Sequence, residues 1–283
     1  MKMLVTGANG YLGKGIVEKL LNDGVEVIAT DFEGERIDAR AEIIPANLFE
    51  IEEPYKYFRQ PDALLHLAWR DGFIHNSVNH IKDLPKHCRF IDKMIDEGIG
   101  KVAVMGSMHE VGFFEGSINE NTPCNPQSRY GISKNALRRL VELKCEEKRT
   151  VLQWLRGFYI VGNTESGSSV FSKLVQAVHR GDKEFPFTLG LNQFDFLDYE
   201  KFCIYVADTV QQESIKGIIN ICSGRPERLS DRVERFLTDN KFNIKLKYGA
   251  FPDRPYDSKA IWGDDTKIAA VEEEKAKREE ARL

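Results

Sequence analysis

A glycine-rich turn near the N-terminus places the strongest constraint on the fold. Gly7, Gly10 and Gly13 follow the apolar segment Lys2–Thr6 and precede the amphipathic segment Lys14–Asn22. Strand, glycine turn and helix in this order let a pyrophosphate approach the backbone and the positive end of the helix dipole. The spacing differs from the common G-x-G-x-x-G pattern, but its context predicts a dinucleotide site.

Apolar strands alternate with amphipathic helices along the first 160 residues. We expect further strands at 25–30, 42–45, 62–67, 101–105 and 151–161, and helices at 80–97 and 128–148. Because the strands are continuously apolar, they are typical of a parallel sheet that helices cover on both faces. The sequence therefore predicts an α/β fold with a Rossmann-type, doubly wound parallel sheet.

The alternation is looser after residue 162. We expect helices at about 169–180, 199–213 and 231–240, and strands at 194–197, 217–222 and 244–248. The pattern predicts a Rossmann domain over 1–162 and a smaller C-terminal α/β substrate lobe over 163–283, with some of its elements returning to the main sheet. The charged tail from Glu272 is interpreted as a solvated helix or a frayed end.

Asp31 ends the second predicted strand, 18 residues beyond Gly13. A carboxylate at this point can accept hydrogen bonds from both hydroxyls of an adenine ribose, and it repels a 2′-phosphate. The residue therefore favours NAD(H) over NADP(H). The neighbouring Phe32 is assigned to the same cofactor site.

Ser107, Tyr130 and Lys134 form a candidate proton-transfer set. Tyr130 and Lys134 are four residues apart on one predicted helix face, and Ser107 follows the strand at 101–105. An ammonium group near a phenol stabilises the phenolate, so we expect Lys134 to lower the pKa of Tyr130. Ser107 can donate to the same substrate oxygen. The set is suited to protonating a carbonyl oxygen or deprotonating an alcohol.

Composition excludes several other classes of protein. The 283 residues carry a net charge of −4, which gives no indication of a nucleic-acid or anionic-membrane partner. The apolar runs are too short to cross a bilayer, and the N-terminus enters a strand directly, so we expect no signal peptide. The five scattered cysteines are typical of reduced thiols in a cytoplasmic protein. His75, His80 and His87 lack metal-ligand spacing, so no metal is expected.

The chain resembles the extended short-chain dehydrogenase/reductases, the NAD-dependent epimerase/dehydratase family that acts on nucleotide sugars. The resemblance covers nearly the whole chain and includes the glycine turn, Asp31, His66-Leu67-Ala68, Ser107 and Tyr130-x-x-x-Lys134. It implies NAD as cofactor, with Lys134 also holding the nicotinamide ribose. The cofactor residues assigned in this way or from the glycine turn are Gly7, Gly10, Tyr11, Leu12, Gly13, Asp31, Phe32, Asn47, Leu48, Leu67, Ala68, Trp69, Tyr130 and Lys134.

The resemblance also implies substrate contacts and a homodimer. Met108 and His109 would lie beside the sugar, Tyr159 occupies the place of an Asn that contacts the diphosphate, and Arg254 occupies the place of a later diphosphate arginine. The helices at about 80–97 and 128–148 resemble those that form a four-helix dimer interface in this family.

Departures from the family pattern narrow the reaction. The 4,6-dehydratases carry an acid pair where this chain has Met108 and His109, and Glu110 is offset by one position, which disfavours elimination of water. We therefore expect an NAD(H)-dependent 4-ketoreductase of a nucleotide-linked 4-keto-6-deoxyhexose. A nucleotide-sugar 4-epimerase is the alternative, because it needs the same Ser, Tyr and Lys.

A protein that senses NAD without catalysis is the alternative from another class. A sensor needs none of Ser107, Tyr130 and Lys134, so their joint presence disfavours this interpretation.

Overall fold

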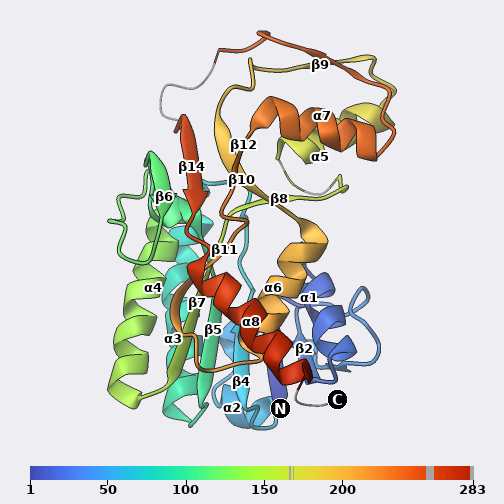
Figure 1. The fold of residues 1–283 in the computed structure, drawn as a ribbon. Helices are drawn as coiled ribbons and strands as arrows, with labels where there is room; N and C mark the ends of the chain where they lie inside the picture. The colour runs from blue at the N-terminus through green and yellow to red at the C-terminus, as the bar shows by residue number, and fades with distance from the viewer. Residues whose placement is uncertain (166, 168, 253–257, 281–283) are drawn as a thin grey trace.

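The fold is described from a computed structural model that covers residues 1–165, 167, 169–252 and 258–280 (Figure 1). In these residues the strands are β1 (Lys2–Thr6), β2 (Glu26–Thr30), β3 (Glu42–Ile43), β4 (Ala63–His66), β5 (Lys101–Ser107), β6 (Gly116–Ile118), β7 (Val151–Gly157), β8 (Tyr159–Val161), β9 (Glu184–Pro186), β10 (Gln193–Asp198), β11 (Gly217–Ile221), β12 (Pro226–Arg228), β13 (Lys245–Lys247) and β14 (Ala260–Gly263). The α-helices are α1 (Tyr11–Asn22), α2 (Pro54–Tyr57), α3 (Asn79–Asp96), α4 (Arg129–Lys148), α5 (Val170–His179), α6 (Tyr199–Val210), α7 (Leu229–Asp239) and α8 (Thr266–Glu280), and the 3₁₀ turns are η1 (Leu48–Glu50) and η2 (Met108–Glu110).

The main sheet confirms the predicted doubly wound architecture. Within the described residues its seven strands are all parallel, in the order β11-β7-β5-β4-β1-β2-β3. The order reverses direction at β1 and β4, so the carboxyl ends of these strands flank the crevice where ligands bind in such sheets. The glycine turn follows β1 directly.

Alternate residues of each main strand pack on opposite faces of the sheet, which explains why the strands are apolar throughout. Met3 and Val5 of β1 face the core formed with α1, α6 and α8, whereas Leu4 faces the core formed with α3 and α4. Figure 1 shows the same two helical layers. Buried on both faces, the sheet provides a rigid base for the loops at its carboxyl edge.

The second lobe is built around a smaller sheet, β12-β10-β14-β6, in which β8 also pairs with β10. Its core is separate and rich in phenylalanine, and α5 and α7 contribute to it. β6 lies before residue 162 in the chain, and β11 returns to the main sheet from beyond it. Each lobe therefore contains elements from both sides of residue 162.

Two expectations about individual elements were wrong in detail. The strand expected over 151–161 is interrupted at Phe158, and its two halves join different sheets as β7 and β8. The helix expected from Lys14 begins at Tyr11, because the helix continues directly from the glycine turn. The tail from Glu272 is helical through Glu280 with exposed or half-buried side chains, as expected for a solvated helix, whereas Ile268 and Val271 earlier in α8 pack against the main core.

Candidate active site

The glycine turn fits a bound dinucleotide phosphate. Gly7 adopts φ +70°, and a Cβ at Gly13 would lie 2.2 Å from the carbonyl oxygen of Gly7, so no larger side chain fits without moving the backbone. Gly10 is the N-cap of α1 and offers no side chain to its amide groups, and the first turn carries no acidic residue. The helix N-terminus is thus free to receive an anion.

Tyr11 and Leu12 begin α1 immediately after this turn. The Tyr11 ring packs 4.6 Å from the Tyr199 ring, and the Tyr199 hydroxyl donates to the Tyr11 carbonyl oxygen at 2.6 Å. Burial raises the pKa of Tyr11 to about 12. Leu12 packs against the core. These contacts fix the start of α1 against α6.

Asp31 lies at the carboxyl end of β2, as the sequence predicts. One carboxylate oxygen accepts from the Asn9 amide at 3.1 Å and the other accepts from the Phe32 amide at 2.8 Å. The carboxylate is therefore held beside the glycine turn. Phe32 is 72% exposed, so its ring is free to lie on a ligand.

The other predicted cofactor residues lie around the same edge of the sheet. Leu67 and Ala68 directly follow β4. A Cβ at Gly7 would lie 2.6 Å from the Ala68 amide nitrogen, so these two residues pack against the glycine turn. Asn47 caps η1 by accepting from the Phe49 amide. Leu48 is buried in the core beneath α3. An adenine contact at Leu48 stays a prediction.

The three residues predicted for proton transfer lie together at the carboxyl end of β5. Ser107 is the last residue of β5, and Tyr130 and Lys134 lie one turn apart near the start of α4. The Ser128 hydroxyl caps α4 by accepting from the Gly131 amide at 3.1 Å, which fixes this first turn. The Ser107 side chain lies beside the Tyr130 phenol.

The titration of the set differs from the sequence-based expectation. Burial raises the pKa of Tyr130 to about 12, against the opposing effect of Ser107. Burial lowers the pKa of Lys134 to about 7, against the opposing effect of Glu110. The Lys134 ammonium donates to the Met105 carbonyl at 2.8 Å, and the expected lowering of the Tyr130 pKa is not observed. With its pKa raised, Tyr130 is a proton donor rather than a phenolate at neutral pH.

Glu110 explains why the offset carboxylate cannot replace the missing acid pair. It is fully buried, and its Oε1 accepts from the Ser107 amide at 2.6 Å and from the Trp154 indole at 3.0 Å. Its Oε2 lies 3.7 Å from the Nε atoms of Arg138 and Arg156. The carboxylate is thus directed into the interior and fully engaged there.

Histidines surround Tyr130, and sequence reasoning missed most of them. Five of the six histidines lie between residues 66 and 109. The His75 ring stacks 5.4 Å from the Tyr130 ring, and the His109 ring lies 4.3 Å from the His75 ring. Burial lowers the pKa of His109 to about 4 and also lowers that of His75. Both rings are neutral at neutral pH. Their clustering in the sequence was the available signal.

The predicted substrate residues lie in different places. His109 is beside Tyr130, whereas Met108 is buried in the core of the second lobe. Tyr159 lies on β8 with its ring 4.7 Å from the Phe194 ring, in the same lobe. Arg254 lies outside the described residues. Substrate contacts for all four stay predictions.

The part of the chain that the structure describes contains neither a candidate metal site nor a membrane-spanning helix. No three or more His, Cys, Asp or Glu side chains are placed to hold a metal ion. In the same residues, no helix has the length and apolar character to cross a membrane.

Comparison with known proteins shows the family of the chain. The model of the NAD dependent epimerase/dehydratase family matches residues 3–222, and the chain belongs to this family.

Two curated relatives span nearly the whole chain. It is 38% identical over 269 residues to the dTDP-6-deoxy-L-talose 4-dehydrogenase (NAD(+)) of Aggregatibacter actinomycetemcomitans, covering 93% of this chain and 99% of that protein. The GDP-6-deoxy-D-talose 4-dehydrogenase of the same organism is 22% identical over 282 residues, covering 96% and 91%.

A solved structure shares the fold. It is the UDP-N-acetylglucosamine 4-epimerase from Methanobrevibacter ruminantium M1 in complex with UDP-N-acetylmuramic acid. The TM-score is 0.83 at 19% identity, and the match covers 95% of this chain and 91% of that one.

Proposed function

We propose that this protein is an NAD(H)-dependent oxidoreductase that interconverts a carbonyl and an alcohol at C4 of a nucleotide-linked 6-deoxyhexose. The juxtaposition of Ser107, Tyr130 and Lys134, at the same edge of the sheet as the glycine turn, carries the proposal of the chemistry. The similarity to a dTDP-6-deoxy-L-talose 4-dehydrogenase along both chains supports the substrate class. The reduction of a 4-keto-6-deoxy sugar is the direction that we propose.

The cofactor would be held by the glycine turn and by Asp31, with its phosphates at the N-terminus of α1. When bound, NADH supplies the hydride that reduces the carbonyl carbon. Tyr130 donates its phenolic proton to the carbonyl oxygen, and its raised pKa supports this role because the phenol stays protonated at neutral pH. Ser107 donates a hydrogen bond to the same oxygen. Lys134 carries the positive charge that stabilises Tyr130 after the proton has left.

The second lobe would hold the sugar nucleotide. We propose that residues 163–283 form most of this binding region, with His109 at its border beside Tyr130. From the family resemblance alone, Tyr159 and Arg254 are proposed to contact the diphosphate. An arginine suits this task because its guanidinium can bind phosphate oxygens in pairs.

NADH absorbance tests the proposal. Mixing purified protein with NADH and a panel of nucleotide-linked 4-keto-6-deoxy sugars, including the dTDP forms, should consume NADH. Tyr130→Phe should lower kcat by about 10²- to 10⁴-fold while NAD binding is retained. Tyr57→Phe, at the exposed end of α2, is the matched control and should leave kcat unchanged.

Two outcomes would redirect the assignment. Conversion of a nucleotide hexose to its 4-epimer without net NADH consumption would establish the epimerase instead. A cellular phenotype that survives Tyr130→Phe but is lost with Asp31→Ala would establish a sensor of NAD.

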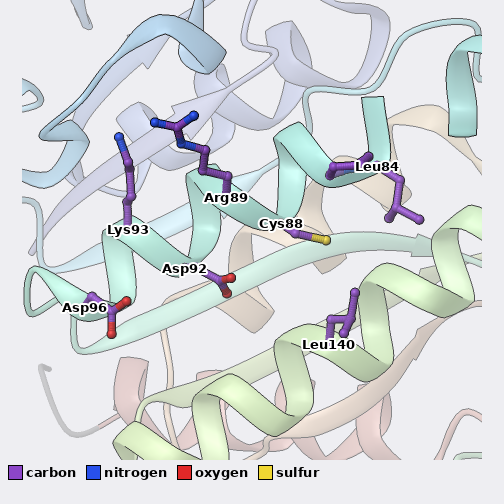
Figure 2. A pocket seen from close by; sticks show the side chains of 8 residues that line it. Leu84, Cys88, Arg89, Asp92, Lys93, Asp96 and Leu140 are labelled. Carbon is purple, nitrogen blue, oxygen red and sulfur yellow. The ribbon is translucent and has the colours of Figure 1, made fainter. Parts of the chain in front are cut away.

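We also propose that α3 and α4 form a homodimer interface. Figure 2 shows the groove between these helices, where Leu84 and Cys88 of α3 lie opposite Leu140 of α4. On the outer face of α4, Leu143 is 59% exposed. Exposed leucines on α4 beside a half-buried leucine of the packed helix α3 are typical of a surface that a partner covers.

Sedimentation equilibrium tests this interface. The wild-type protein should sediment as a dimer, and Leu143→Glu should sediment as a monomer. Leu189→Glu, at a similarly exposed leucine of the second lobe, should stay dimeric. A monomeric wild-type protein would contradict the proposal.

The compartment is a further proposal. All five cysteines are free in the structure. Free thiols support residence in a reducing compartment such as the cytoplasm.

A further inference from the structure

The Lys134 side chain rests on an aromatic ring as well as on a carbonyl group. Its Nζ lies 3.9 Å from the centre of the Trp69 ring and donates to the Met105 carbonyl at 2.8 Å. Lys134 is 2% exposed, so little water reaches its charge. An ammonium over an indole face is attracted by the ring quadrupole, most strongly where water is absent. The ring thus supplies part of the solvation that burial removes.

The Trp69 ring is itself held in place by two histidines from α3. Its Nε1 donates to His80 Nδ1 at 3.0 Å, and His80 Nε2 lies 3.0 Å from the Ile74 carbonyl oxygen. These two contacts require His80 to be the neutral tautomer that carries its hydrogen on Nε2. The His87 ring stacks on Trp69, with centroids 4.6 Å apart and an interplanar angle of 17°.

Polar contacts link the His87 ring to the main sheet. His87 Nδ1 lies 2.9 Å from His66 Nε2, and His66 Nδ1 lies 2.9 Å from the Thr6 hydroxyl. Thr6 and His66 end β1 and β4, the two strands at the ligand-binding crevice. The orientation of Trp69 is therefore fixed from both the sheet and α3. Because the Trp69 ring is fixed in this way, it can fix the position of the Lys134 ammonium that lies over it.

We propose that Trp69 is a positioning residue that keeps Lys134 protonated and in place for Tyr130 and for the cofactor. This role is distinct from the cofactor contact assigned to Trp69 above. The proposal depends on the proposed function only in the measurement of turnover. The state of Lys134 itself can be measured in the protein without cofactor or substrate.

The charges around Lys134 explain why the ring matters. Burial lowers the pKa of Lys134 to about 7, so the ammonium is close to losing its proton at neutral pH. Glu110 on η2 raises this pKa, while His66 on β4 and His87 on α3 are neutral. Tyr130 on α4 is protonated and adds no charge. A cation–π contact in a site without water is worth about a tenfold change in an equilibrium constant, or about one pH unit.

NMR titration of the ligand-free protein labelled with ¹³C at lysine Cε tests the proposal directly. The signal of Lys134 is assigned by its absence in Lys134→Met. In Trp69→Leu the pKa of Lys134 should fall by about one unit, and in Trp69→Phe, which keeps a weaker ring, it should fall by less. Trp262→Leu, at a tryptophan of the second lobe, should leave this pKa unchanged. Melting temperatures establish that each variant is folded.

The pH profile of NADH-dependent turnover is the second readout. Activity should decline as the pH rises through the pKa of Lys134, and Trp69→Leu should move this decline to lower pH by the same amount as the NMR titration. An unchanged or raised pKa in both Trp69 variants would overturn the proposal. Absence of turnover in the wild-type protein, with the NMR shift intact, would instead count against the proposed function alone.

Discussion

Ser107 and Glu110 hold each other across a single turn. The Ser107 amide donates to Glu110 Oε1 at 2.6 Å, and the Ser107 hydroxyl oxygen accepts from the His109 amide at 3.3 Å. The Ser107 backbone is thus held by the buried Glu110 carboxylate, and its proposed substrate-facing hydroxyl is held by the His109 amide. Glu110 therefore contacts both the buried Trp154 in the core and Ser107 in the candidate site.

Replacing Glu110 should therefore affect both stability and turnover. Glu110→Ala removes the buried acceptor of the Trp154 indole and the buried negative charge beside Arg138 and Arg156, which should cost about 3–5 kcal/mol of unfolding free energy in urea titrations. Glu110→Gln keeps an acceptor for the Ser107 amide, so it should reduce the unfolding free energy and the turnover by less than Glu110→Ala. Glu53→Gln, in an exposed pair with Lys56, should change the unfolding free energy by less than about 0.5 kcal/mol. Equal effects of the three changes would contradict this account.

Gly13→Ala should abolish NAD binding and destabilise the fold. The new Cβ would lie 2.2 Å from the Gly7 carbonyl oxygen, so the turn must open, at a cost of about 1–3 kcal/mol. Gly24→Ala is the matched control, because Gly24 has φ +78° but no atom lies within 4 Å of the added Cβ. It should cost about 1–2 kcal/mol through strain alone and leave NAD binding intact. Calorimetric titration with NAD decides, and retained affinity in Gly13→Ala would contradict the assignment of the turn.

Asp31→Asn should weaken NAD binding and admit NADP. Removing the charge weakens hydrogen bonds worth about 1.5–3 kcal/mol to an ionised acceptor, so the Kd for NAD should rise by about tenfold or more. The repulsion of a 2′-phosphate disappears with the same charge. The ratio of the two affinities is the measurement, and Glu33→Gln, at an exposed carboxylate two residues away, is its control. A ratio that moves equally in both variants would rule out a specific role for Asp31.

Acidification should destabilise the protein through its buried histidines. Burial lowers the pKa of His87 to about 3 and holds that of His66 well below its usual value near 6.5. Because the unfolded chain binds these protons more readily, stability is complete above about pH 6.5 and is lost as the pH falls toward the folded pKa.

Urea titrations between pH 7 and pH 5 measure this loss. It should reach about 2 kcal/mol for His87 at pH 5, at 1.36 kcal/mol for each pH unit. His87→Gln should flatten the pH dependence. His179→Gln, at an exposed histidine paired with Glu165, should not. A wild-type stability that is independent of pH in this range would refute the argument.

Local patterns were sufficient to predict the nucleotide-binding half of the fold. The continuous apolar strands around Leu4, Leu64 and Val102 required a sheet covered on both faces, and the glycine turn required a close backbone approach. The second lobe was harder to predict because its sheet joins short strands from distant parts of the chain. β6 and β14, 142 residues apart between Ile118 and Ala260, pair with each other without a local signal.

In the candidate site, too, the features set by local sequence could be predicted and those set by tertiary packing could not. Ser107, Tyr130 and Lys134 could be named because their spacing along a strand end and a helix turn is local. The electrostatics could not be predicted, because desolvation depends on every segment that packs around a group. The pKa of Tyr130 was expected to fall and instead rises, and Glu110 turned out to be buried between two arginines.

By itself the sequence determined which strands, turns and helices form, and it identified the chemical groups available at the edge of the sheet. Its information is local because hydrophobic period, glycine spacing and helix-turn spacing all act over a few residues. Only the tertiary structure decided that Trp69, from the loop after β4, lies against Lys134 of α4, and that His75 and His80 lie against Tyr130. Those contacts join segments about 60 residues apart, and they exist only because the parallel sheet brings the carboxyl ends of its strands to one edge.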